Sequence, residues 1–177
     1  MSISKETLEH IFKNQEPNLV FVETGSFLGD GIQKALDVGF KEVHSIEYGE
    51  QLYKGCLKRF ESNENVFLYH GDSGKILYDV CKNITDPIVF WLDGHYSEGI
   101  TARSNKNCPL YEELDQICQL KENNHTILID DVRDFGKTME VTMQEILVKL
   151  VKINNKYSIS YLDGYVPNDI LMAKCVN

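Results

Sequence analysis

The chain has 177 residues, of which 42% are hydrophobic and 25% are charged, and its formal net charge is −9. This length and this balance predict one globular domain spanning residues 1–177, and they exclude a disordered tail or a fibrous repeat. The excess of acidic residues repels phosphate backbones, so we expect a small-molecule substrate and no nucleic-acid partner.

The first half of the chain alternates between strand and helix patterns. Strands are expected at residues 18–23, 42–47 and 65–70, and helices at residues 29–39, 49–61 and from Ser73 past Val80. The strands are short apolar or alternating runs, and the helices carry apolar residues at spacings of three and four. Ser73 is placed to cap the third helix.

The second half continues this alternation and then changes it. Strands are expected at residues 87–93, 125–130, 156–163 and 169–176, and helices at residues 110–122 and 137–152. The first two of these strands are the most apolar, as is typical of central parallel strands buried on both faces. The last two are joined by a short turn, which predicts an antiparallel hairpin. The order βαβαβαβαβαββ predicts an α/β fold, a Rossmann-like doubly wound seven-stranded sheet that is mostly parallel and ends in that hairpin.

Polar residues follow five of the predicted strands at the point where each strand ends. They are Glu23, Thr24 and Gly25, then Glu47, then Gly71 and Asp72, then Asp93, Gly94 and His95, and finally Asp130 and Asp131. Asp and Gly are also common there as turn residues and helix caps. Because open α/β sheets bind ligands at the carboxyl edge of their strands, five such groups together indicate a binding site.

The first loop, ETGSFLGDG (23–31), has glycines where a backbone must approach a ligand closely. It lacks the GxGxxG spacing of dinucleotide-binding loops. Glu23 favours a cationic group, such as the amino group of a methionine moiety. Glu47 is placed to accept the hydroxyl protons of a ribose, and Asp72 to contact the edge of an adenine.

Four segments in order, ETGSFLGDG, SIEYGE, HGDS and FWLDG, resemble the cofactor motifs of the class I S-adenosylmethionine (SAM)-dependent methyltransferases. The resemblance extends over nearly the whole chain from Asn18 onward, and it implies SAM as the cofactor. The matching cofactor-binding residues are Glu23, Thr24, Gly25, Ser26, Gly29, Glu47, Tyr48, Asp72, Ser73 and Asp93. It also implies that Glu23 and Gly25 lie near the methionine part, Glu47 at the ribose, and Asp72 with Ser73 near the adenine.

The second half is similar to a narrower branch, the metal-dependent O-methyltransferases of the catechol and macrocin types. In that branch, an Asp that ends the fourth strand and an acidic pair that ends the fifth bind one magnesium ion. Asp93, Asp130 and Asp131 match this pattern. Oxygen-only ligands suit Mg²⁺. The other interpretation is that Asp130 or Asp131 only caps a helix.

Methyl transfer to an alcohol requires that the hydroxyl oxygen lie in line with the S–CH₃ bond and that the hydroxyl lose its proton. A metal lowers the pKa of this hydroxyl and also orients it. His95 is the first candidate for the base, and Asp93 is the second. The polar loop SEGITARSNKNC (97–108) is expected to cover the metal, unless it is only a surface loop. The expected substrate contacts are Tyr96, Thr101, Arg103 and Asp134.

The polar character of this loop favours a hydroxyl of a sugar, nucleotide sugar, glycan or other small polar diol as the acceptor. Two other functions stay open, a metal-dependent hydrolase of phosphate esters and a non-catalytic module that binds the cofactor. Five cysteines without a CxxC pair, no apolar run near the roughly 20 residues of a membrane span, and no signal-peptide core predict a cytoplasmic protein without a membrane partner. A second subunit, in a homodimer, is one way to cover the site.

Overall fold

The computed structural model describes residues 3–13, 19–93 and 108–175. Within these residues, the strands are β1 (Val20–Thr24), β2 (Glu42–Glu47), β3 (Val66–His70), β4 (Ile88–Leu92), β5 (Thr126–Ile129), β6 (Tyr157–Leu162) and β7 (Ile170–Cys175). The helices are α1 (Lys5–Lys13), α2 (Asp30–Val38), α3 (Glu50–Arg59), α4 (Ser73–Cys81), α5 (Leu110–Ile117) and α6 (Met143–Ile153), with a short 3₁₀ turn η1 (Val132–Asp134).

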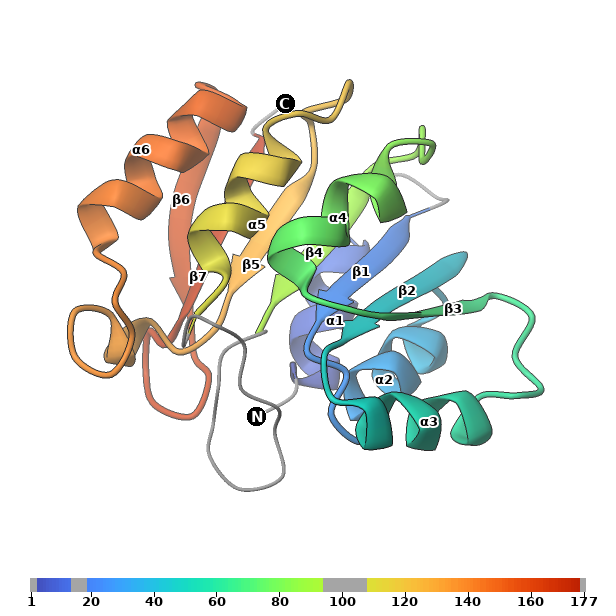
Figure 1. Ribbon diagram of the computed structural model, residues 1–177. Coiled ribbons are helices and arrows are strands. Elements are labelled where there is room, and N and C mark those ends of the chain that lie inside the picture. The colour runs from blue at the N-terminus through green and yellow to red at the C-terminus, as the bar shows by residue number, and fades with distance from the viewer. Residues whose placement is uncertain (1–2, 14–18, 94–107, 176–177) are drawn as a thin grey trace.

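The described strands form one seven-stranded sheet in the order β3-β2-β1-β4-β5-β7-β6 (Figure 1). Strands β1 to β5 are parallel, whereas β7 runs antiparallel to both β5 and β6. Every residue of β1, β4 and β5 is buried, as expected for central strands with helices on both faces. The predicted Rossmann-like sheet with its antiparallel hairpin is therefore confirmed.

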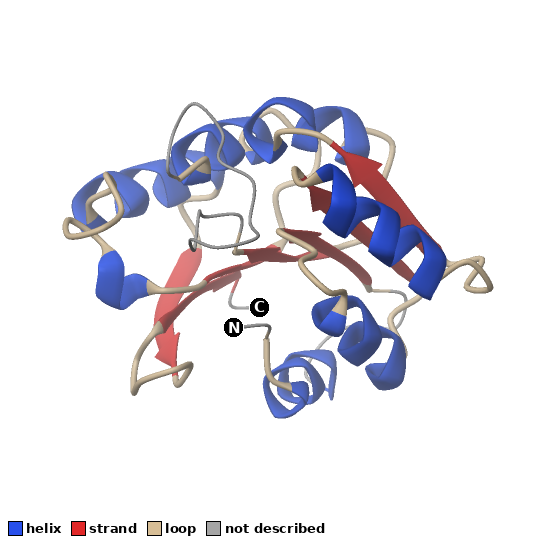
Figure 2. Cartoon of the chain, turned by 60° about the horizontal axis from the view of Figure 1, so that its bottom comes forward, coloured by secondary structure: helices blue, strands red, loops and turns tan. Residues whose placement is uncertain are grey.

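Two helical layers enclose the sheet (Figure 2). Helices α1, α2 and α3 contribute to a core on one face, and α4, α5 and α6 contribute to a core on the other. Alternate residues of β1 separate the two cores, since Phe21 packs with the first layer and Val22 with the second. No helix among the described residues is long and apolar enough to cross a membrane.

Helix α1 was not expected from the sequence. Its buried Leu8 and Ile11 lie three residues apart and pack in the core that contains Phe21 and Phe40. Ser4 begins the helix by accepting a hydrogen bond from the Thr7 backbone N–H, at 3.0 Å from N to Oγ. The spacing and the cap were therefore present in the sequence as a helix signal.

Two predicted helices are shorter than the sequence suggested. The helix expected at 110–122 ends at Ile117, and the one expected at 137–152 begins only at Met143. Before Met143, the backbone turns at Gly136, whose φ is 69° and whose N–H donates to the carbonyl oxygen of Val141. The apolar residues of this turn enter the core, so they imitated a helical pattern without forming a helix.

Candidate functional site

The sheet changes direction between β1 and β4. The chain moves outward from β1 through β2 to β3 on one side, and from β4 to β5 on the other. At such a switch point the loops after the two central strands separate, and ligands of α/β sheets bind in the crevice between them. Residues at the ends of β1 to β5 are brought to this one edge by the parallel register.

Glu23, at the end of β1, is buried and points into the protein. Its Oε1 accepts a hydrogen bond from Ser45 Oγ at 2.7 Å, and Ser45 Oγ is also 2.5 Å from Ser26 Oγ. Burial raises the pKa of Glu23 to about 8, although the Ser45 hydrogen bond lowers it. A side chain at Gly31 of α2 would overlap Glu23 Oε2. Glu23 thus fastens the loop to β2 and α2, and its contact with a methionine amino group stays a prediction.

Two glycines of this loop are required by the backbone. Gly25 and Gly29 have φ of 85° and 84°, in the left-handed region that favours glycine. A Cβ on Gly29 would also lie 2.6 Å from the ring of Phe60, at the end of α3. The loop therefore approaches α3 too closely for any side chain at this position.

Glu47, at the end of β2, binds the backbone of the loops that follow β1 and β2. Its Oε2 accepts the Phe27 N–H at 2.9 Å, and its Oε1 accepts the Gly49 N–H at 2.7 Å. Each carboxylate oxygen retains a further lone pair, so the group can still accept ribose hydroxyls. Tyr48 beside it is 44% exposed, which leaves its ring accessible to a ligand.

Asp72, after β3, is the N-cap of α4. Its Oδ1 accepts the Gly74 N–H at 3.1 Å, and its Oδ2 lies 2.9 Å from Lys75 Nζ. The prediction that Ser73 caps this helix is wrong, because the Ser73 hydroxyl donates instead to Glu113. Asp72 immediately precedes the helix, so its carboxylate can accept the second backbone N–H of the helix, which is the usual geometry of an N-cap.

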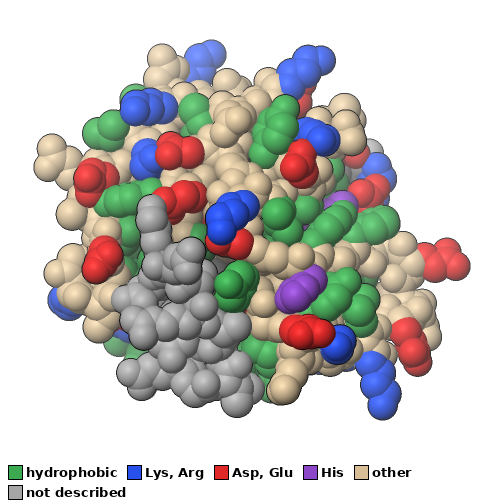
Figure 3. All heavy atoms as spheres, in the orientation of Figure 1, with side chains coloured by type: hydrophobic (Ala, Val, Ile, Leu, Met, Phe, Trp, Pro, Cys, Tyr) green, Lys and Arg blue, Asp and Glu red, His purple; other side chains and the backbone are tan. Residues whose placement is uncertain are grey.

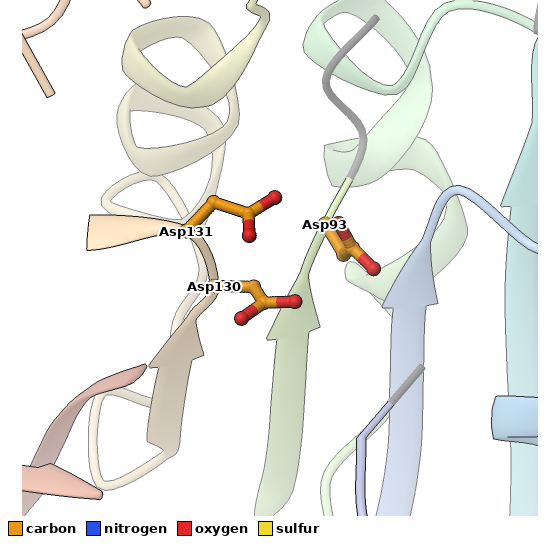
Figure 4. A group of neighbouring side chains, drawn as sticks. All are labelled: Asp93, Asp130 and Asp131. Carbon is orange, nitrogen blue, oxygen red and sulfur yellow. The ribbon is translucent and has the colours of Figure 1, made fainter. Parts of the chain in front are cut away.

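Three carboxylates converge at the ends of β4 and β5 (Figure 4). Asp93, Asp130 and Asp131 each offer an oxygen, and these oxygens all lie within 4.8 Å of one another. Asp130 and Asp131 are buried, and burial together with the negative charges of Asp93 and Asp131 raises the pKa of Asp130. A cation bound among them would favour the ionised carboxylates and so oppose this rise in pKa.

Asp131 does not act as a helix cap by its side chain. It precedes η1 with φ of 57°, and its carboxylate makes no cap hydrogen bond. Its Oδ1 lies 2.5 Å from Arg133 Nη1, and the same guanidinium binds the buried carboxylate of Asp169. Asp131 is thus oriented by an arginine that is itself bound to Asp169, the residue just before β7.

Glu113 of α5 belongs to the same region and was missed in the sequence. It is 1% exposed, accepts the Ser73 hydroxyl at 2.5 Å between oxygens, and hydrogen bonds to the Thr24 side chain. The sequence signal was its position on the apolar face of α5, three residues after Leu110 and directly before Leu114. A carboxylate on a buried helical face requires polar partners, and here they come from two other elements.

Of the expected substrate contacts, Asp134 lies in η1, with its Oδ2 at 3.6 Å from Arg133 Nε. His95, Tyr96, Thr101 and Arg103 lie outside the described residues. Their roles as base and substrate contacts therefore stay predictions.

No protein-family model matches the chain, and no curated protein matches it. Solved structures match over nearly its whole length. The O-methyltransferase TomG from Streptomyces achromogenes, in complex with SAM, superposes with a TM-score of 0.67 at 13% identity over 99% of this chain and 82% of TomG. SAM-bound CalS10, an amino pentose methyltransferase from Micromonospora echinaspora, gives 0.65 at 7% identity over 97% and 90%. An rRNA methylase from Streptococcus thermophilus gives 0.59 at 13% identity over 100% and 99%.

The names of two of these proteins state different substrates, an amino pentose and rRNA, so the similarity concerns the fold and not the acceptor. In this chain the superposed fold includes the sheet order β3-β2-β1-β4-β5-β7-β6 and its antiparallel hairpin. The chain has the fold of the class I SAM-dependent methyltransferases.

Proposed function

We propose that this chain is a SAM-dependent methyltransferase that acts, with Mg²⁺ held by Asp93, Asp130 and Asp131, on a hydroxyl of a sugar or another small polar diol. The observation that carries the proposal is the convergence of three carboxylates beside the switch-point crevice of a methyltransferase fold. Side chains separated by nearly forty positions meet there because parallel neighbouring strands end at the same edge.

The donor set fits Mg²⁺. All three groups are carboxylates, the ligand type that Mg²⁺ prefers, and Asp130 and Asp131 are buried. Burial, together with the negative charges of Asp93 and Asp131, raises the pKa of Asp130, and a divalent cation bound there would lower it again. A bound Mg²⁺ would supply Lewis acidity that lowers the pKa of an acceptor hydroxyl.

The residues of the chain have distinct parts in this proposal. Glu47 would bind the ribose, Tyr48 would contact the adenosine, and the loop fixed by Glu23 would present its backbone N–H groups to the methionine part. Asp93, or His95 beyond the described residues, would accept the acceptor's proton. Holding the hydroxyl and the sulfonium methyl in line is the main contribution, because orientation alone lowers the barrier by several kcal/mol, roughly 7–11 in favourable cases.

A small polar acceptor agrees with the charge of the molecule. The net charge is −9, and on the face shown in Figure 3 the Lys and Arg side chains are scattered among Asp and Glu side chains. Binding to nucleic acid depends on gathered basic residues. A neutral diol would meet no such requirement, and two adjacent hydroxyls can chelate one metal ion. The expected homodimer stays a prediction, which light scattering would check.

Thermal unfolding with S-adenosylhomocysteine (SAH) and Mg²⁺ tests the proposal. A ligand at 100 times its Kd adds about 2.7 kcal/mol to stability, which is roughly 5–10 °C in Tm for a chain of this size. We expect each ligand to raise the Tm of the unmodified protein. Asp131→Ala should abolish the Mg²⁺ shift and keep the SAH shift, whereas Asp79→Asn, an exposed change on α4, should keep both.

The acceptor is then found by transfer of a radiolabelled methyl group from SAM to free sugars, nucleotide sugars and catechols. No SAH shift at millimolar concentration would overturn the proposal. An SAH shift without any Mg²⁺ shift would favour the non-catalytic module. Turnover of an aryl phosphate in the absence of SAM would favour the hydrolase.

A further inference from the structure

Glu113 is a buried carboxylate that the proposed mechanism does not use. It projects from α5, and its Oε1 accepts the hydroxyl of Ser73, the first residue of α4, at 2.5 Å. It also hydrogen bonds to the side chain of Thr24, the last residue of β1. Thr24 Oγ1 in turn accepts the backbone N–H of Asp93 at 3.3 Å. One carboxylate therefore links the ends of β1 and β4 to the start of α4.

The direction of these hydrogen bonds follows from the chemistry of the groups. Burial raises the pKa of Glu113 to about 7, so above this pH the carboxylate is ionised and only accepts, and both hydroxyls then donate to it. A threonine hydroxyl has a single hydrogen, and once this hydrogen points to Glu113 the lone pairs of Thr24 Oγ1 are left for the Asp93 N–H. Glu113 thus fixes the rotamer of Thr24 that holds the backbone of Asp93.

A second contact fastens α5 to the same turn of α4. Gln116, one helical turn after Glu113, donates from Nε2 to the carbonyl oxygen of Gly74, and its Oε1 accepts the Tyr78 N–H at 2.7 Å. Gly74 and Tyr78 are partners in an ordinary helical hydrogen bond, so the side chain of Gln116 bridges that pair. The helices approach closely here, because a Cβ on Gly74 would lie 2.9 Å from Glu112 Cβ.

We propose that Glu113 is a positioning residue that holds Asp93, on the metal side of the crevice, and the start of α4, on the adenine side, in one fixed arrangement. The inference rests on the proposed function, because it assigns those two sides to a metal and to SAM. Its physical basis is that the Glu113 side chain binds Thr24, which holds the backbone N–H of Asp93, and Ser73 at the start of α4. Loss of its acceptor oxygens would let the ends of the strands move relative to α4 without removing any group that contacts a ligand.

Glu113→Gln is the first test, because it keeps the size of the side chain but replaces one acceptor oxygen by a donor. One of the two hydroxyls then faces an NH₂ group and must turn away. We expect the Kd of SAH or of Mn²⁺, used as the metal probe, to rise about tenfold, in line with the loss of one hydrogen bond to a charged group. Asp115→Asn, which removes an exposed charge from the same helix, should leave both Kd values within twofold.

Thr24 gives a second test that does not depend on the stability of the Glu113 variant. Thr24→Val removes the hydroxyl and should weaken Mn²⁺ binding to the same extent, whereas Thr24→Ser keeps the hydroxyl and should restore it. In the double variant Thr24→Val with Glu113→Gln, the two effects on Mn²⁺ binding should not add, because both reach Asp93 through the Thr24 hydroxyl.

Calorimetric titrations well below the Tm separate positioning from plain stabilisation. A lower Tm for Glu113→Gln with both Kd values unchanged would overturn the inference, and so would additive effects in the double variant. Failure of the unmodified protein to bind SAH would instead contradict the proposed function. In that case the Mn²⁺ titrations of the same variants still decide the role of Glu113.

Discussion

Glu23 shows that a carboxylate at the end of a strand can have a structural role in the fold. Its Oε1 is held by Ser45, and its Oε2 lies against Gly31, so the group is enclosed on both sides. Burial raises its pKa from 4.5 to about 8. The native protein therefore binds the proton of this carboxyl more tightly than the unfolded chain does.

This raised pKa predicts a pH dependence of stability. Below pH 4.5 the group is protonated in both states. Between about pH 4.5 and 8 unfolding releases its proton, so the stability that depends on Glu23 falls as the pH rises, by up to about 1 kcal/mol per unit. Glu23→Gln mimics the neutral form and should be nearly neutral at pH 5 but stabilising at pH 8. Urea unfolding at both pH values measures this difference.

Glu61→Gln is the matched control, because Glu61 is exposed and its substitution should change the free energy of unfolding equally little at pH 5 and pH 8. A Glu23→Gln difference that is the same at both pH values would contradict the raised pKa. Loss of SAH binding in Glu23→Gln at pH 5, where the group is neutral in both proteins, would indicate a direct contact with the cofactor.

At the scale of elements, the start of α2 is fitted to the end of β1. Gly31 lies in the first turn of α2, where a methyl group would overlap the Glu23 carboxylate. Gly55 lies in the middle of α3 with nothing within 4 Å of the position of a Cβ. The same substitution at the two glycines therefore meets opposite surroundings in helices of similar length.

We expect Gly31→Ala to destabilise the protein by roughly 1–3 kcal/mol, the range for an overpacked buried site. Gly55→Ala should stabilise it by about 0.5–1 kcal/mol, because alanine restricts the unfolded chain and fits an open helical position. Thermal unfolding should show a lower Tm for the first variant and a higher Tm for the second. Equal shifts of the same sign would show that Gly31 does not contact Glu23 as described.

At the scale of the whole molecule, the sheet is stable because helices cover both of its faces. Helix α1 completes the cover on one face, and Leu8 is fully buried against that core. On α6, by contrast, Val151 is 60% exposed. Position in the layered fold, not the type of side chain, should decide what a truncation to alanine costs.

Leu8→Ala is expected to lower the free energy of unfolding by about 2–5 kcal/mol, the usual loss for a buried leucine. Val151→Ala should change it by less than about 0.5 kcal/mol. Urea unfolding monitored by circular dichroism measures both. If Leu8→Ala were as mild as Val151→Ala, α1 would not be part of the folded core.

The sequence by itself determined the strands, most of the helices and the residues at the strand ends. Apolar runs such as the one ending at Glu23, and acidic residues following them, are local patterns that need no knowledge of neighbours. It was less successful at α1 and at the start of α6. At α1 the helix signal was present but short, whereas the apolar residues before Met143 imitated a helix, and tertiary packing decided both outcomes.

Only the tertiary structure decided which of the candidate residues share a site. Asp93, Asp130 and Asp131 meet because β4 and β5 are neighbours in register, and the order of strands is not written in any local pattern. The same holds for Glu113, whose partners Thr24 and Ser73 lie 89 and 40 positions away (113 − 24 and 113 − 73). Local chemistry fixes what each segment can become, whereas contacts between distant segments depend on how the whole chain buries its apolar faces.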